Sequence, residues 1–228
     1  MMIKKLKTIC CLLSLFASLT CVAVAAPSDK PKDSTMTTNE PNVPYSCTFS
    51  DHGWNADDWM FVRRSDYNST DAWVQKADHI ENADAASNSF TSMVLKKKWH
   101  GDFHISAGMA FTDRMAPEVS LASNLGIDAQ GRPEYEKRME VVLFDQGINV
   151  WLLDKVNGKT TWIKTAYAQF PLQKNTPYQL QVTRKGKQLT IAVGDHIFGY
   201  YEASLPDDLY VGVTACEGIN RLYNFSIK

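Results

Sequence analysis

An acid, an amide and a large aromatic side chain share one face of a predicted β-hairpin. Residues 140–153 form two β-rich runs joined by a turn that carries Gly147. A two-residue loop at Gln146 and Gly147 makes one face wholly apolar, with Leu143 opposite Val150 and Val141 opposite Leu152. The other face carries Glu140, Val142, Phe144, Asn149 and Trp151. Solvent-facing strand positions usually hold Lys, Thr or Ser, so this face has the composition of a binding surface.

The elements around this hairpin are predicted to be strands. Between residues 45 and 228, period-two alternation recurs about every ten residues, without a long stripe of helical period. The clearest alternating runs are 103–111, 178–183, 189–193, 209–215 and 223–227. Many strands joined by turns are typical of two stacked antiparallel sheets, so the predicted fold class is all-β, a β-sandwich or jelly roll, with a closed barrel as the alternative. The first strand, 45–50, is expected to pair with the last, 222–228.

The first 44 residues have the composition of a leader and a tether. Residues 1–26 contain three lysines, a short apolar run and then small residues, which is the pattern of a secretory signal peptide. The apolar run is too short to span a bilayer, so we expect a cleaved leader and an exported protein without a membrane span. Lipidation at Cys21 is the alternative, although Thr20 fits such a signal poorly. Residues 27–44 are polar and rich in Pro, Ser and Thr, which predicts a flexible linker before one domain at 45–228.

Charge and cysteine content exclude several function classes. Without the three lysines of the leader, 21 basic residues remain against 25 acidic ones, a formal charge of −4. A mildly acidic chain without extended basic runs has no electrostatic footprint for nucleic acid. Two cysteines, Cys47 and Cys216, lie outside the leader, and together with the scattered histidines they show no zinc-site spacing. Export permits a disulfide between them and their strand parity argues against it, so the pairing stays open.

The second half of the domain resembles a known superfamily. The resemblance is carried by residues 175–182, a hairpin through Gly186 and Gly194, and residues 210–213 and 224–227. These segments are similar to the C-terminal half of concanavalin A-like lectin/glucanase domains, and most similar to the laminin G-like and 3-keto-disaccharide hydrolase group of secreted bacterial proteins. The resemblance implies a jelly roll with one concave sheet that handles carbohydrate. The ExDxxE motif of the glucanases and the Asn-Ser-Gly-Ile segment of the keto-disaccharide hydrolases are absent, so no catalytic residue is carried over by motif.

Two acids are candidates for catalysis on such a sheet. Glu118 alternates with Val119, and Glu140 alternates with Val141, so both are expected to point away from the apolar core. Glycoside cleavage needs one carboxylic acid to protonate the leaving oxygen and a second carboxylate as base or nucleophile. Glu118 and Glu140 are therefore the pair to test. The alternative is that both are ordinary solvent-facing acids, as most carboxylates are.

Six further residues are candidates for substrate binding: Trp151, Asn149, His104, Arg114, Glu217 and Arg221. The tryptophan offers a flat ring with an N–H donor, suited to stacking on a pyranose, although burial in the core is the alternative. The asparagine shares its face, and the histidine alternates outward along its own strand. The first arginine precedes the acidic strand and suits a carboxylated sugar. The last two residues lie in the loop between the final strands, a common position for binding residues.

The leading hypothesis is a secreted carbohydrate-binding domain whose partner is an oligo- or polysaccharide. A glycoside hydrolase using paired carboxylates is the alternative, and an adhesive module that acts through protein contacts is a third hypothesis. The resemblance also brings calcium as a candidate cofactor, because this superfamily frequently carries it. The available oxygen ligands are Asp57, Asp58, Asp145, Asp207 and Asp208. None of them shows a diagnostic spacing, so no metal ligand is assigned.

Overall fold

The computed structural model describes residues 41–228 apart from 66, 87 and 114. The predicted signal peptide, Cys21, most of the predicted linker and Arg114 lie outside the described residues. The end of the predicted linker is fastened to the domain: the Asn42 side-chain amide donates to the His100 carbonyl at 2.6 Å and accepts from the His100 N–H at 3.0 Å. Within the described part, no helix is long and apolar enough to cross a membrane.

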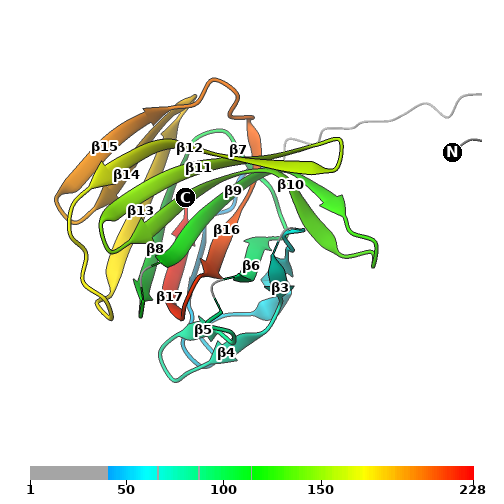
Figure 1. Ribbon diagram of the computed structural model, residues 1–228. Coiled ribbons are helices and arrows are strands. Elements are labelled where there is room, and N and C mark those ends of the chain that lie inside the picture. The colour runs from blue at the N-terminus through cyan, green and yellow to red at the C-terminus, as the bar shows by residue number, and fades with distance from the viewer. Residues whose placement is uncertain (1–40, 66, 87, 114) are drawn as a thin grey trace, which may run out of the picture. The chain divides into compact units, whose positions relative to one another are not determined.

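The described chain folds into two stacked sheets, as predicted for an all-β sandwich (Figure 1). Sheet A has the order β15 (His196–Tyr201), β14 (Gln188–Val193), β13 (Tyr178–Lys185), β8 (Phe103–Phe111), β17 (Asn220–Ile227), β5 (Ile80–Asn82) and β4 (Trp73–Gln75), and β1 (Tyr45–Thr48) also pairs with β17. Sheet B has the order β12 (Lys159–Gln169), β11 (Gly147–Val156), β10 (Pro133–Phe144), β9 (Met115–Ile127), β16 (Asp208–Cys216), β6 (Ser89–Leu95) and β2 (Trp59–Phe61). The short strands β3 (Asn68–Thr70) and β7 (Trp99–His100) join β6 and β16, and a 3₁₀ turn, η1, covers Ala56–Asp58.

The chain's described ends meet in sheet A. Tyr45 of β1 lies opposite Ile227 of β17 in antiparallel register, which confirms the predicted pairing of the first and last strands. Between the sheets lies the main core, built from the apolar alternation of the strands. Its members from β8 are Phe103, Ile105, Ala107, Met109 and Phe111, all predicted to point inward and all buried.

The β10–β11 hairpin has the predicted faces but a different loop. Asp145 and Gln146 form the loop, and Gly147 pairs with Phe144. Consequently Val141 faces Val150 rather than Leu152, a shift of two residues that preserves side-chain parity. Gly147 has φ +125°, and a Cβ there would lie 2.1 Å from the Ala168 carbonyl oxygen. The glycine therefore serves the close approach of β12, and the predicted loop position was wrong.

Sheet B curls over the face that points away from sheet A, here named the outer face. The Val62 N–H donates to the Ser92 carbonyl of β6 at 3.0 Å. One residue later, the Arg63 N–H donates to the Pro133 carbonyl at 2.9 Å and the Arg63 carbonyl accepts from the Tyr135 N–H at 3.0 Å. The segment after β2 therefore joins β6 to the beginning of β10, two strands of sheet B that β9 and β16 separate. This connection covers part of the outer face.

Candidate binding face

The outer face of sheet B carries a second buried cluster. Its apolar members come from β6, β9, β10, β11 and β16 and from the segment that follows β2: Val62, Phe90, Val94, Ala116, Ala122, Tyr135, Val142, Leu153 and Cys216. A fully solvated outer face would carry polar side chains at these positions. The curled part of sheet B instead encloses them, and charged residues are enclosed with them.

Two buried carboxylates share one guanidinium in this cluster. Nη2 of Arg138 lies 3.7 Å from Oε2 of Glu118 and also pairs with Oε1 of Glu140. The three side chains are at most 2% exposed. The guanidinium of Arg138 also stacks on the rings of Phe90 and Tyr135, with centroids at 4.7 and 4.3 Å. Arg138 thus neutralises part of a charge that would be costly to bury alone.

Burial dominates the ionisation of this cluster. It raises the pKa of Glu118 above the ordinary 4.5, and the opposing attraction of Arg138 is smaller. It likewise lowers the pKa of Arg138 below its ordinary value, against the attraction of Glu118. The thiol of Cys216 donates to Oε1 of Glu118 at 3.3 Å, and burial raises the pKa of this thiol as well. Because one guanidinium faces two carboxylates, a proton on Glu118 brings the trio to neutrality.

A chain of hydroxyls ties four strands together beside this trio. The Tyr135 hydroxyl of β10 lies 2.7 Å from Oγ of Ser92 on β6. Ser92 is 2.6 Å from Oγ1 of Thr214 on β16, and Thr214 is 2.8 Å from Oγ of Ser120 on β9. A hydroxyl can both donate and accept, so the chain satisfies buried polar groups without charge. It also fixes the curl of sheet B.

Aromatic side chains line the open part of the outer face, on β11 and β12. The rings of Trp151 and Trp162 lie 5.2 Å apart between centroids, with planes at 41°, and both are partly exposed. Tyr167, opposite Asn149 in the register, is 62% exposed. The ammonium of Lys164 lies 5.7 Å from the Trp151 centroid and 5.4 Å from the Tyr167 centroid. Trp151, Trp162, Lys164 and Tyr167 are named here the aromatic platform.

The aromatic platform continues into a pocket. The guanidinium of Arg64 is stacked between the rings of Trp162 and Tyr67, 3.6 and 4.0 Å from their centroids. Arg64 and Tyr67 also line a pocket of about 420 Å³ between the β2–β3 segment and the β9–β10 hairpin. The other lining residues are Arg63, Ser65, Asn68, Ser69, Asp128, Gln130, Arg132 and Glu134. Polar side chains of the protein therefore lie at one end of the platform, next to the place of a bound ligand.

Comparison with solved structures identifies the architecture. The chain is similar to the carbohydrate binding module CBM66 from Bacillus subtilis, with 13% identity over 72% of this chain and 91% of that chain and a TM-score of 0.50. It is also similar to the VIP36 exoplasmic/lumenal domain in its Ca²⁺/Man3GlcNAc-bound form, with 8% identity, 80% and 86% coverage and a TM-score of 0.55. The chain has a lectin-type β-sandwich fold. No protein-family model and no curated protein matches the sequence.

A viral module extends this likeness. The CBM2 module of the evolved Dit protein of Lactobacillus casei BL23 phage J-1 matches with 13% identity over 80% of this chain and 94% of that chain, with a TM-score of 0.51. At such identities the likeness establishes the fold alone. The concanavalin A-like architecture expected from residues 175–227 is consistent with these neighbours.

The lectin-type sandwich brings four of the predicted site residues together. Glu118, Glu140, Asn149 and Trp151 all lie on the outer face, as their alternation predicted. Both acids and the asparagine are buried, whereas Trp151 is partly exposed. Glu217 lies at the edge of this face, where its carboxylate accepts a hydrogen bond from the Tyr67 hydroxyl at 3.1 Å.

Two other predicted residues lie on the other sheet. His104 belongs to β8 of sheet A, where its Nδ1 lies 2.8 Å from Oγ1 of Thr183 on β13. Arg221 belongs to β17 of sheet A, 3.7 Å from Oε2 of Glu81. Grouping His104 with Glu118 was wrong, because alternation gives the face of a strand and not the sheet to which it belongs. The predicted loop position of Arg221 was also wrong, because this residue lies within β17.

Sequence reasoning missed most of the aromatic platform. Trp162 and Lys164 alternate with Ile163 along β12, and this signal was present in the sequence. It predicts a third strand whose outward residues extend the hairpin's polar face. The buried partner Arg138 carried no comparable signal, because an arginine on a strand is usually solvated.

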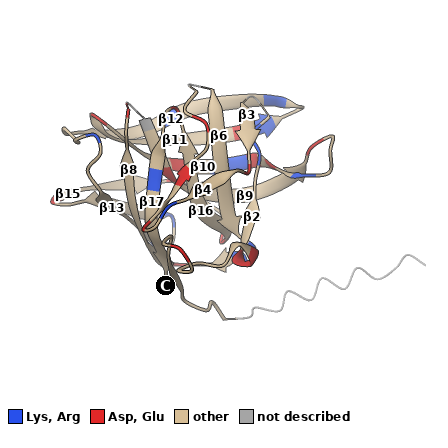
Figure 2. Cartoon of the chain, turned by 90° about the horizontal axis from the view of Figure 1, so that it is seen from below, with Lys and Arg blue, Asp and Glu red and all other residues tan. Residues whose placement is uncertain are grey.

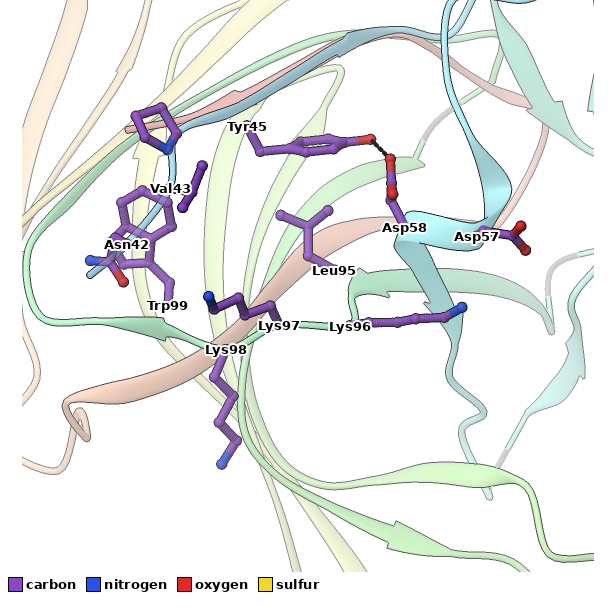
Figure 3. A pocket seen from close by; sticks show the side chains of 11 residues that line it. Asn42, Val43, Tyr45, Asp57, Asp58, Leu95, Lys96, Lys97, Lys98 and Trp99 are labelled. Atoms are coloured by element: carbon purple, nitrogen blue, oxygen red, sulfur yellow. Dashed lines mark hydrogen bonds between the residues drawn. The ribbon is translucent and has the colours of Figure 1, made fainter. Parts of the chain in front are cut away.

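A second pocket, of about 310 Å³, lies where the described chain begins (Figure 3). Leu95 and Trp99 give it an apolar wall, and the side chain of Tyr45 is fixed above by two hydrogen bonds. Nε1 of Trp59 donates to the Tyr45 hydroxyl at 3.1 Å, and this hydroxyl donates to Oδ2 of Asp58 at 3.2 Å. Lysines 96–98 line the pocket as well. Among the described residues, its lining includes none of the predicted catalytic or substrate-binding residues, although Asp57 and Asp58, two of the candidate calcium ligands, line it.

Calcium and a disulfide find no support in the described geometry. Among residues 41–228 without the three gaps, no three His, Cys, Asp or Glu side chains gather into a metal site. Asp207 instead pairs with Arg184 at 3.1 Å, and Asp208 lies 2.9 Å from Nδ1 of His100. These two acids are therefore engaged by basic side chains in this conformation. Cys47 packs against the main core and Cys216 belongs to the outer cluster, and both are free thiols.

Proposed function

We propose that this chain is a carbohydrate-binding protein and that a glycan lies on the aromatic platform. The observation that carries the proposal is the pair Trp151 and Trp162, two partly exposed indoles 5.2 Å apart on one face of sheet B. Flat aromatic rings offer apolar area together with a polar edge, which suits the alternating C–H and hydroxyl surface of a pyranose. Carbohydrate-binding modules with this fold support the same proposal.

Trp151 and Trp162 are held in place by neighbouring strands and side chains, which favours ligand binding at this position. Trp151 lies on β11, which is paired along its length with β10 and β12, so little conformational freedom is lost when a ligand binds. Trp162 is held from one side by Trp151 and from the other by the stacked guanidinium of Arg64. Preorganised aromatic side chains of this kind supply most of the binding energy in many recognition sites.

Hydrolysis is less favoured by the geometry. A raised pKa at Glu118 is a property of general acids in glycosidases. A general acid or base must, however, lie within hydrogen-bond reach of the substrate. Glu118 and Glu140 are at most 2% exposed and both contact Arg138, so a sugar on the platform does not reach them in this conformation. Their catalytic role stays a prediction, tested by turnover in Glu118→Gln and Glu140→Gln.

We also propose that the protein is exported. The pattern of residues 1–26 supports a cleaved signal peptide, with lipidation at Cys21 as the alternative. Within the superfamily, the sequence resemblance of residues 175–227 supports the laminin G-like and 3-keto-disaccharide hydrolase group. Mass spectrometry of the exported protein distinguishes a free N-terminus near residue 26 from a lipidated Cys21.

A glycan screen with two matched variants tests the proposed function. The full chain and the variants Trp151→Ala and Tyr201→Ala are compared on immobilised oligo- and polysaccharides. Tyr201 is 64% exposed on the edge strand β15 of sheet A, so its variant controls for loss of an exposed aromatic ring. We expect Trp151→Ala to weaken binding about tenfold or more, the scale of a lost aromatic anchor, and Tyr201→Ala to retain it. Equal affinity of the two variants contradicts the proposal.

A further inference from the structure

Building on the proposed function, we propose that the glycan is acidic and that Lys164 recognises its carboxylate or sulfate groups. The observation is the place of the Lys164 ammonium between two ligand-facing rings, 5.7 Å from the centroid of Trp151 and 5.4 Å from that of Tyr167. A pyranose stacked on Trp151 carries its ring substituents toward the neighbouring strand, where Lys164 stands directly opposite Trp151 in the register.

Lys164 has no carboxylate partner within the described chain, and two aromatic rings hold its ammonium instead. Two other lysines of sheet B are compensated: Lys155 pairs with Glu134, and Lys137 lies 3.9 Å from Asp154. The rings on either side keep the ammonium in place through cation–π attraction, which leaves its N–H donors available. An ammonium positioned in this way is a site for an anion.

The acids of the outer face are buried or paired with a cation, and Glu217 at its edge accepts a hydrogen bond from the Tyr67 hydroxyl. Glu118 and Glu140 are buried against Arg138, and Glu134 forms an ion pair with Lys155. On β11 and β12, both fully described, the side chains that share the platform's face include no acid, and Lys164 is the cation there that no carboxylate compensates. Over the rest of the described chain, charges of both signs are interspersed (Figure 2). The platform is therefore locally positive on a chain whose formal charge is −1.

Charge-matched polysaccharides test this inference. Pectate is compared with methyl-esterified pectin, and dextran sulfate with dextran, so each pair differs in charge on one backbone. The variant is Lys164→Met, and the control is Lys159→Met, which removes the same charge from an exposed position at the other end of β12. Lys164→Arg keeps the charge at the site.

We expect the wild type to bind at least one charged member more than tenfold tighter than its neutral counterpart, with an advantage that falls as salt is added. Lys164→Met should bring this ratio close to one, while Lys159→Met and Lys164→Arg should keep it. Preference for pectate alone identifies a carboxylate ligand, and preference for dextran sulfate alone identifies a sulfate ligand; both support the proposal.

Two results overturn the acidic preference. One is equal affinity of the wild type for both members of each pair, and the other is an equal fall of the ratio in Lys159→Met and Lys164→Met. If neutral glycans are bound and Trp151→Ala abolishes that binding, the platform stands while the acidic preference fails. If the wild type retains no glycan in the screen, the proposed function fails as well.

Discussion

Neighbouring residues on strands β9, β10 and β11 show two ways to bury a side chain. Val119, Val141 and Val150 point into the main core and are 0% exposed. The residues beside them, Glu118, Glu140 and Asn149, point to the outer face and are 1%, 0% and 5% exposed. Burial is the same on both faces, whereas the chemistry is opposite. The main core is stabilised by apolar area removed from water, and the outer cluster depends on charge compensation.

The contribution of the outer cluster to stability therefore depends on pH and on charge partners, whereas that of the main core does not. An apolar side chain in the main core has no ionisation state, so its contribution does not vary with pH. The outer cluster holds two carboxylates against one guanidinium. Its contribution therefore changes when a partner is removed and when a proton is added.

The largest expected effect follows from removing the shared cation. Arg138→Met leaves Glu118 and Glu140 buried without their guanidinium, which should lower the free energy of unfolding by about 3–5 kcal/mol at pH 7. Urea denaturation measures the loss. It should shrink near pH 4, because the raised pKa of Glu118 leaves this carboxyl protonated there and without need of a cation. Arg132→Met is the control: this arginine is 44% exposed and paired with Asp128, so its loss should stay below about 1 kcal/mol.

A truncation in the main core sharpens the contrast. Leu143→Ala removes a side chain that is 0% exposed between the sheets and should cost about 2–5 kcal/mol. The same denaturation series should give the same loss at pH 4 and pH 7, because no titrating group is involved. A loss that varies with pH as strongly as that of Arg138→Met would erase the proposed distinction between the two faces.

A smaller effect of opposite sign is expected for Glu118→Gln. Burial raises the pKa of Glu118 in the folded state, so the folded chain holds a proton that the unfolded chain releases above about pH 4.5. This group therefore favours folding below that pH and opposes it as the pH rises. Glutamine cannot ionise, so the variant should be more stable than the wild type at pH 7 and equal to it near pH 4. A less stable variant at pH 7 would show that the ion pair outweighs burial.

The strand content and the hairpin faces were predictable because alternation is local. Phe103 to Phe111 predicted β8, and the parity of residues 140–153 placed Glu140, Asn149 and Trp151 on one face. The hairpin loop was not predictable from the hairpin, because Gly147 is required by the Ala168 carbonyl of β12. The alternation pattern of two strands carries no information about a contact with a third strand.

The burial of the acidic pair was also beyond local reasoning. Glu118 and Glu140 are covered because Arg63 joins Pro133 and Tyr135 and curls sheet B, a contact between residues about 70 apart in sequence. Assignment to a sheet fails for the same reason: His104 has the predicted parity, but β8 pairs with β13 and β17. Long-range pairing decides which outward-facing residues meet.

The position of the bound glycan is measured most directly through the tryptophan side chains. The chain has six tryptophans, so an ¹⁵N-labelled sample gives an indole N–H resonance for each. During titration with the tightest-binding glycan of the screen, the resonances of Trp151 and Trp162 should shift, whereas that of Trp99 in the 310 Å³ pocket should not. Shifts at Trp99 with Trp151 and Trp162 unmoved would contradict the account and place the ligand at the other pocket.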